Sequence, residues 1–258
     1  MENKETFNFI AREYERYRPT YPNEMFDDIL NYSNIKNDEK ILEIGCGTGQ
    51  ATGGFVHKDF KNITCIELGD KLAHFTTDKF KSVNTIKVVN TSFEDWDGSG
   101  SPYKLAVSGT AFHFIEPEFG YRKVWELLED TGSIAFFWTV HVPLFDVVNN
   151  EIRSHYQELA PHLDDSKYKL PEETVYERKM ITEKTGIFTN IIVKEYSQTQ
   201  SHTSNDFVSL LNTNSRHRQL SKPVKSTLLE KIKKTIDKAG GYVNKEHRVA
   251  LFLGKKLT

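Results

Sequence analysis

Three glycines at alternate positions, Gly45, Gly47 and Gly49, follow the short apolar run Ile41–Ile44. Such a run predicts a buried strand, and glycines let the backbone after it turn tightly and approach a ligand that any Cβ would hold away. The spacing does not fit a dinucleotide site, because the G-x-G-x-x-G pattern has its third glycine where this chain has Gln50. A phosphate-binding Walker loop is also excluded, since no Gly-Lys-Ser/Thr follows.

Two carboxylates accompany this turn. Glu43 precedes the first glycine and suits a ligand with a positively charged amino acid group rather than phosphates. Glu67 ends the next apolar run, Ile63–Glu67, where an acid can accept hydrogen bonds from ribose hydroxyls. The two acids together are expected to bracket an adenosine-like ligand. The alternative is that both are ordinary surface carboxylates and that the glycines form a plain turn.

The elements that position these residues alternate between strand and helix. Short runs rich in branched or aromatic residues predict strands, and polar amphipathic segments of helical length separate most of them. These runs are Ile41–Ile44, Ile63–Glu67, Ile86–Val89, Leu105–Ser108 and Ser133–Trp138, with Asn190–Tyr196 and Arg248–Leu253 as two further strands at one edge. We therefore expect an α/β fold: a doubly wound, mostly parallel, Rossmann-like seven-stranded sheet with an antiparallel edge strand and a helical cap.

Composition and charge limit the class of protein. The 34 Lys+Arg and 36 Asp+Glu residues give a formal net charge of −2, so nothing global indicates nucleic acid as a partner. Cys46 and Cys65 are too few for a disulfide scaffold and lack zinc-site spacing. The longest apolar stretch, Ser133–Phe145, is too short to span a bilayer. We expect a cytoplasmic protein with a small-molecule partner and no membrane partner; the oligomeric state stays open.

The chain resembles the class I S-adenosylmethionine-dependent methyltransferases, in particular the small-molecule branch (type 11) that includes trans-aconitate and quinone-biosynthesis methyltransferases. Glu43-Ile-Gly-Cys-Gly-Thr-Gly49 is similar to the family's first motif and Glu67 to its ribose-binding acid. Thr91-Ser92-Phe93-Glu94-Asp95-Trp96 resembles the adenine-binding turn, with Ser92 in place of the usual acid. Leu128-Glu-Asp-Thr-Gly132 matches the family's Leu-Lys-Pro-Gly-Gly turn in part.

The resemblance implies the cofactor S-adenosyl-L-methionine. The residues it assigns to cofactor binding are Glu43, Gly45, Cys46, Gly47, Gly49, Glu67, Leu68, Ser92, Phe93, Ser108 and Thr110. It also implies a single methyltransferase domain over residues 1–258. Its expected parts are an N-terminal lid (1–22), a cofactor-binding core (38–138), cap insertions (139–188 and 203–243) and edge strands (189–202 and 246–254).

The acceptor side of the site is expected around Ser108-Gly109-Thr110-Ala111-Phe112-His113-Phe114, which resembles the Ser-x-x-Ala-Phe-His-Trp segment lining the family's methyl-transfer site. His113 is the candidate catalytic base or acceptor-orienting group; the alternative is a structural histidine that packs on Phe112. Tyr14, Arg18 and Arg216 are candidate substrate-binding residues, since a cation can pair with an acidic acceptor. A packing helix and a solvated cationic cluster are their respective alternatives. No metal constellation is expected.

Competing functions remain open at this point. A protein that binds S-adenosylmethionine or S-adenosylhomocysteine without turnover would use the same glycine turn. A nicotinamide dehydrogenase is disfavoured by the glycine spacing, and a nucleic acid methyltransferase by the acidic balance and the lack of an Asn-Pro-Pro-Tyr-like motif. The acceptor, and whether oxygen, nitrogen or carbon is methylated, depend on cap side chains that vary on a common scaffold.

Overall fold

The computed structural model describes residues 15, 17, 20–98, 100 and 102–258. Most of the expected N-terminal lid (1–22), including the candidates Tyr14 and Arg18, lies outside these described residues. The chain divides into two units. The sheet unit comprises Thr20–Thr139, Val175–Tyr196 and Val249–Thr258, and the described helical unit comprises Val140–Thr174 and Ser197–Arg248. The boundaries of lid, core and cap within one methyltransferase domain stay predictions.

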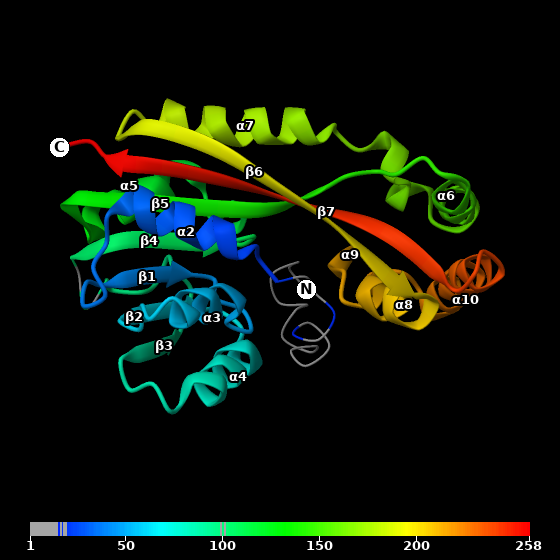
Figure 1. Cartoon of the computed structure of the whole chain (residues 1–258), viewed down its shortest axis with the longest axis horizontal. Helices are drawn as coiled ribbons and strands as arrows, with labels where there is room; N and C mark the ends of the chain where they lie inside the picture. Colours follow the sequence, from blue (N-terminus) through cyan, green and yellow to red (C-terminus); the bar gives the residue numbers. More distant parts are fainter. Residues whose placement is uncertain (1–14, 16, 18–19, 99, 101) are drawn as a thin grey trace. The chain divides into compact units, whose positions relative to one another are not determined.

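Seven strands form one sheet in the order β3-β2-β1-β4-β5-β7-β6. Their bounds are β1 Ile41–Ile44, β2 Ile63–Glu67, β3 Ile86–Asn90, β4 Tyr103–Gly109, β5 Leu128–His141, β6 Phe188–Thr203 and β7 Tyr242–Lys256. β1 pairs in parallel with β2 and β4, β2 with β3, and β4 with β5. In Figure 1, β7 runs against its neighbours β5 and β6. The predicted mostly parallel seven-stranded sheet with an antiparallel strand at this edge is confirmed.

The strand order reverses at β1, whose neighbours are β2 on one side and β4 on the other. In open α/β sheets this topological switch point is where ligands bind, beyond the carboxyl ends of the strands. The glycine turn follows β1 directly, Glu67 ends β2, and Thr110 follows the last residue of β4. The fold therefore brings the ends of three strands that carry predicted site residues to one edge of the sheet.

Helices cover both faces of the sheet (Figure 1). α2 (Asn23–Ser33) and α3 (Gln50–His57) bury Phe26 and Phe55 in one core with the odd-numbered side chains of β4 and β5. α4 (Asp70–Phe80) packs along β2 and β3. α5 (Pro117–Leu127) contacts the opposite face through Tyr121, which lies against Phe136 of β5. Pro22 is the N-cap residue of α2, so the helix begins directly after it.

β5 is longer than the predicted Ser133–Trp138 strand because α5 passes into it without a separate turn. Tyr103 pairs with Leu128 and Leu105 pairs with Ser133, so the chain advances from 103 to 105 in β4 but from 128 to 133 in β5. The prediction that Leu128–Gly132 forms a turn between two elements is therefore wrong. The segment is an irregularity within the strand β5.

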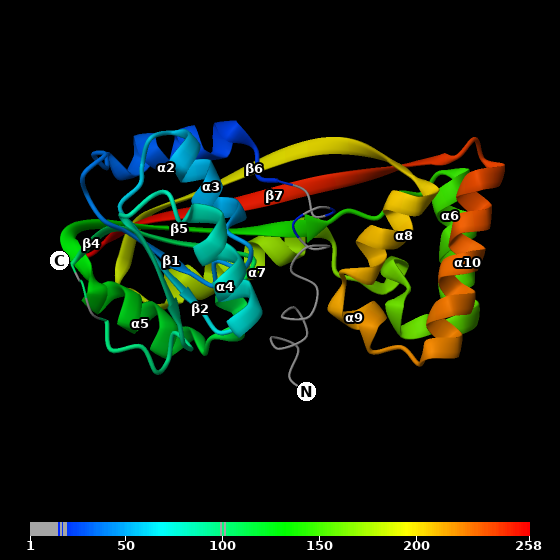
Figure 2. The same cartoon turned by 90° about the horizontal axis from the view of Figure 1, so that it is seen from below.

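The helical unit has its own apolar core. α10 (Lys222–Lys238) buries Leu228, Ile232 and Ile236, which lie at helical spacing on one apolar face. The partners include Ile152 of α6 (Val147–Leu159) and Phe207 of α8 (Ser204–Asn212). Figure 2 shows these helices side by side. The remaining elements are α9 (Ser215–Arg218), two short 3-10 turns η3 (Pro161–Leu163) and η4 (Asp165–Lys167), and the start of α7 (Pro171–Lys184), whose residues from Val175 onward belong to the sheet unit.

Candidate active site

The glycine turn has the left-handed backbone that favours glycine. Gly45, Gly47 and Gly49 have φ values of 71°, 58° and 72°. A Cβ on Gly45 would lie 2.4 Å from Cβ of Ala111, whereas a Cβ on Gly47 would meet nothing within 4 Å. Gly45 is therefore required by packing inside the protein. Gly47 borders open space, as expected where a backbone approaches a ligand.

Glu67 holds this turn in place. Its Oε2 accepts the backbone N–H of Gly47 at 2.8 Å and its Oε1 accepts that of Gly69 at 2.8 Å. The carboxylate is buried, and burial raises its pKa although the backbone donors oppose that shift. Each carboxylate oxygen has a second lone pair, so the geometry leaves acceptors for ribose hydroxyls. Glu67 has the position that the sequence predicted for it.

Glu43 lies deeper than Glu67. It is 1% exposed, and its Oε2 accepts a hydrogen bond from Oγ1 of Thr52, in α3, at 2.7 Å. Burial raises the pKa of Glu43 to about 7, against the opposing effect of the Thr52 donors. Its carboxylate therefore ties β1 to the first turn of α3. An interaction of Glu43 with a positively charged ligand stays a prediction. At this depth Glu43 would act on the ligand through its charge.

α4 supplies two contacts to the turn that the sequence analysis missed. Oγ1 of Thr76 donates to the carbonyl of Gly47 at 2.7 Å, and Nζ of Lys79 donates to the carbonyl of Thr48 at 3.1 Å. These residues are three positions apart and so share a helix face. A polar pair at that spacing in the helix after the ribose-binding acid is the signal that could have revealed them.

The turn also contains polar groups that suit a polar ligand. Oγ1 of Thr48 and Nε2 of Gln50 are buried and have no hydrogen-bond partner among the described residues. Burying such a group unpaired costs on the order of 1–3 kcal/mol. Together with the open space at Gly47, they fit the amino acid end of S-adenosyl-L-methionine.

Cys46 lies between Gly45 and Gly47 and is 6% exposed. Contact with Cys65 and burial raise the pKa of its thiol well above the usual value.

Of the three residues predicted on the adenine side, Leu68 is exposed, whereas the side chains of Ser92 and Phe93 contact other parts of the protein. Leu68, next to Glu67, is 40% exposed and offers an apolar surface. Oγ of Ser92 donates to Asp95 Oδ2 at 2.6 Å and accepts the Asp95 backbone N–H, so it stabilises its own turn. Phe93 is buried and packs on Trp96. The Phe93 ring is therefore covered by the protein.

Two predicted residues shape the end of β4. Oγ of Ser108 donates to the carbonyl of Ile44 at 2.7 Å and so links β4 to the end of β1. Thr110 has a φ of 56°, which is strained for a branched residue, and its N–H donates to the carbonyl of Phe137. The hydroxyl of Tyr21 lies 3.5 Å from Oγ1 of Thr110. Tyr21 was part of the lid-like sequence, but it was not among the predicted site residues.

His113 lies in the short 3-10 turn η2 (Phe112–Phe114). Its Nδ1 accepts the indole N–H of Trp138 at 3.1 Å. Burial beside neighbouring atoms and the positive charge of Arg178 lower the pKa of His113 to about 4, although part of the ring is exposed. The ring is therefore neutral near pH 7. Because Nδ1 is an acceptor, the proton is on Nε2, and His113 presents a donor rather than a free basic nitrogen.

Arg216 belongs to the helical unit. Its Nη2 donates to the carbonyl of His162 at 3.0 Å, and its guanidinium centre lies 4.8 Å from the ring centroid of Tyr168. Both contacts stay within that unit. Its substrate-binding role stays a prediction.

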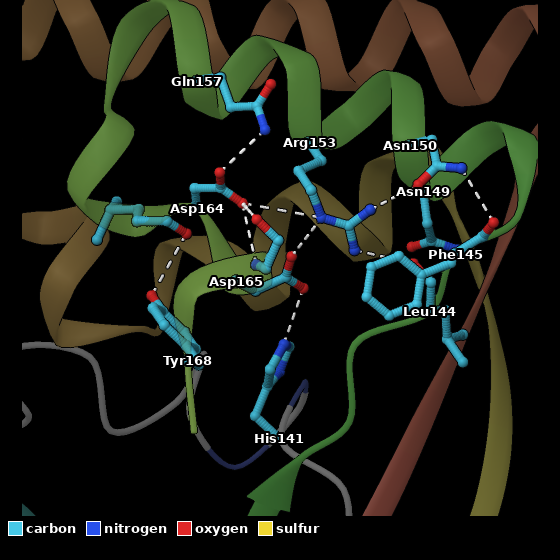
Figure 3. Close-up of polar contacts among 12 residues, drawn as sticks. His141, Leu144, Phe145, Asn149, Asn150, Arg153, Gln157, Asp164, Asp165 and Tyr168 are labelled. Carbon is cyan, nitrogen blue, oxygen red and sulfur yellow. Dashed lines mark hydrogen bonds and ion pairs between the residues drawn. The ribbon is translucent and has the colours of Figure 1, made fainter. Parts of the chain in front are cut away.

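A polar network is also part of the helical unit. Figure 3 shows Asp165 between His141 and Arg153, with Oδ2 2.8 Å from His141 Nε2 and Oδ1 accepting from Arg153 Nε at 2.8 Å. Burial raises the pKa of Asp165, but the His141 and Arg153 contacts outweigh it and hold the pKa at about 2. Lys245 lies 3.1 Å from the other ring nitrogen of His141. All of these groups have partners, as in a structural network.

The chain is similar in sequence to known methyltransferases. The family model described as ribosomal RNA adenine dimethylase matches residues 22–115. A Dictyostelium discoideum protein named as a methyltransferase is 27% identical over 239 residues, covering 90% of this chain and 85% of that protein. CRG1 of Saccharomyces cerevisiae, named as an S-adenosylmethionine-dependent methyltransferase, is 25% identical over 54% of this chain and 48% of its own.

Among solved structures, phosphoethanolamine N-methyltransferase 2 of Haemonchus contortus in complex with S-adenosyl-L-methionine superposes with a TM-score of 0.56. Its sequence is 13% identical, and the match covers 97% of this chain and 57% of that one. This likeness shows the fold. Fold, glycine turn and sequence relatives together define an S-adenosylmethionine-dependent enzyme. The chain is an S-adenosylmethionine-dependent methyltransferase, and its fold is that of the class I enzymes.

No described helix is long and apolar enough to cross a membrane. No group of three or more His, Cys, Asp or Glu side chains within the described ranges is placed to hold a metal ion.

Proposed function

We propose that this methyltransferase acts on a small, anionic acceptor whose attacking atom needs no general base. The observation that carries the proposal is the state of His113. Trp138 occupies its Nδ1 lone pair, and the ring is neutral with its proton on Nε2. An acceptor that must lose a proton gains nothing from such a group, whereas a carboxylate is already nucleophilic.

When bound, S-adenosyl-L-methionine supplies a methyl group on a positively charged sulfur, and in-line displacement leaves the S–C electron pair on sulfur. The protein has to align the reactants and exclude water. In the proposal, Glu67 and the backbone at Gly47 hold the ribose and amino acid parts. The Nε2–H group of His113 orients the acceptor by a hydrogen bond. Thr110 fixes the backbone between them.

A small acceptor is favoured over RNA, although part of the chain matches a ribosomal RNA methylase family. That match covers residues 22–115, which contain the cofactor-binding strands that many methyltransferases share. The net charge of −2 gives no general attraction for phosphate backbones. The Haemonchus protein, which matches in fold, is named for the small acceptor phosphoethanolamine and for methylation on nitrogen. No feature of the described residues favours a non-catalytic binding protein.

The test is transfer of labelled methyl from S-adenosyl-L-methionine to three pools: small carboxylic acids, small amines and phenols, and ribosomal RNA. We expect label in the carboxylic acid pool. Label only in RNA would contradict the small-molecule acceptor, and label only in amines or phenols would contradict the role given to His113. Tight S-adenosylhomocysteine binding with no transfer to any pool would support the binding-protein alternative.

A further inference from the structure

Arg178 is a cation at the same end of the sheet that the reaction scheme does not yet use. It lies on α7 within the sheet unit, and its guanidinium centre is 4.1 Å from the ring centroid of Trp138. Trp138 in turn donates to His113. The Arg178 charge is also one of the two causes that lower the pKa of His113. Arg178, Trp138 and His113 therefore form one contiguous group at the ends of β4 and β5.

The guanidinium has no anionic partner among the described residues. Its Nε is buried without any hydrogen-bond partner, and no ion pair involves its side chain in the described part of the chain. Glu177, the adjacent acid, is exposed, and its charge only partly opposes the burial that lowers the pKa of Arg178. The phenol of Tyr121 is buried, its pKa is raised to about 12, and its hydroxyl bonds to Thr182, so it stays neutral.

Such an arrangement is costly unless a ligand completes it. Arg178 is partly exposed, but its buried Nε loses hydration that no partner replaces. Other cations of this unit are satisfied: Lys194 pairs with Asp28 at 2.6 Å and Lys79 donates to carbonyls of the glycine turn. Stacking on Trp138 holds the planar fork of Arg178 in a fixed orientation, which suits bidentate binding of an oxyanion.

We propose that Arg178 binds an oxyanion group of the methyl acceptor, a carboxylate or a phosphate, with His113 Nε2–H as a second donor. The inference rests on the proposed function, because it assumes that the acceptor lies at the ends of β4 and β5. It assigns the anion-binding role to α7 rather than to Arg18 or Arg216. Trp138 is a positioning residue, which holds both donors without touching the reacting atoms.

The test measures the binding of malonate and of inorganic phosphate to protein saturated with S-adenosylhomocysteine, by calorimetry, with the uncharged malonamide as a blank. The variants are Arg178→Gln and, as the matched control on the same helix, Lys179→Gln, whose exposed side chain pairs with Glu183. We expect one of the two anions to bind wild type and the control equally. Arg178→Gln should weaken that anion by about tenfold or more, the scale of one charge-assisted hydrogen bond.

The outcomes separate this inference from the proposed function. Failure of S-adenosylhomocysteine to bind any form would overturn the function itself. Normal S-adenosylhomocysteine binding with equal anion binding by Arg178→Gln would overturn only the role of Arg178. Weaker S-adenosylhomocysteine binding by Arg178→Gln would also overturn it, since Arg178 would then hold the cofactor's carboxylate. If Arg178→Gln does not fold, Arg178→Lys should bind the anion more weakly than wild type, because it keeps the charge but loses the fork; unchanged binding by Arg178→Lys would argue against the proposal.

Discussion

The carboxylate of Glu67 and the backbone N–H of Gly47 are 2.8 Å apart, so the acid at the end of β2 is bonded directly to the turn after β1. This contact means that Glu67 has two roles: it fixes the glycine turn and it is the predicted partner of the ribose. Substitutions in the pair should therefore affect cofactor affinity more than folding.

Glu67→Gln should weaken S-adenosylhomocysteine binding by about 1.5–3 kcal/mol, the range for charge-assisted hydrogen bonds. The amide retains one acceptor oxygen, so the fold should persist. Calorimetry measures the affinity and circular dichroism the fold. Glu126→Gln, on an exposed position of α5, is the control and should bind normally. An unchanged affinity in Glu67→Gln would remove Glu67 from the site.

Gly45→Ala and Gly47→Ala should separate folding from binding. Both positions have a left-handed backbone, which costs a non-glycine residue roughly 1–2 kcal/mol. Only Gly45→Ala adds a clash, with Ala111. We expect Gly45→Ala to lower the thermal midpoint more, and Gly47→Ala to lose cofactor affinity in a protein that still folds. The reverse ranking in thermal unfolding would contradict the packing at Gly45.

His113 should not produce an ionisation in the activity profile near pH 6.5. Burial and Arg178 lower its pKa to about 4, so the ring stays neutral above about pH 5 and protonates only as the pH falls through 4. The dependence of kcat/KM on pH checks this. A limb near pH 6.5 that disappears in His113→Asn would show instead that His113 titrates as a base. His113→Asn, which keeps a donor, should retain more activity than His113→Ala.

Asp165 should stabilise the helical unit in a pH-dependent way. Its folded pKa is about 2, below an unfolded value of about 3.9, so its contribution of roughly 2 kcal/mol is present above pH 4 and is lost as the pH falls toward 2. Asp165→Asn should reduce protection of α6 amides from hydrogen exchange at pH 7 by that amount. The control is Asp78→Asn, which is exposed on α4. Equal protection in both variants would count against the network.

Local signals explain which parts of the fold the sequence predicted. β1 and β2 have the predicted bounds, because a short apolar run bounded by turn residues has few alternatives. The glycine turn could also be predicted, because the spacing of its glycines follows from the backbone conformation of the turn. The irregularity at Leu128–Gly132 was missed because the register of β5 depends on its pairing with β4, which is a tertiary property.

The sequence predicted the site residues that lie at the ends of strands. It did not predict those that helices contribute. Thr76, Lys79 and Arg178 belong to α4 and α7, whose rotation about their axes follows from packing rather than from motifs. The state of His113 could not be predicted either, because its partner Trp138 comes from another strand. Phe93 matches the adenine-binding turn of the family, yet its ring is buried against Trp96, a packing choice that no local pattern specifies.

The covered thiol of Cys46 has an experimental consequence. Alkylating reagents attack the thiolate and need access to it, and Cys46 offers neither while the glycine turn is closed. Cys65, the other cysteine, is fully buried in the core. Modification of Cys46 by iodoacetamide therefore reports how often the turn opens, without any introduced label. A ligand that bridges Glu67 and the turn should lower the rate at which Cys46 is alkylated. Cys65 should react only when the sheet unfolds.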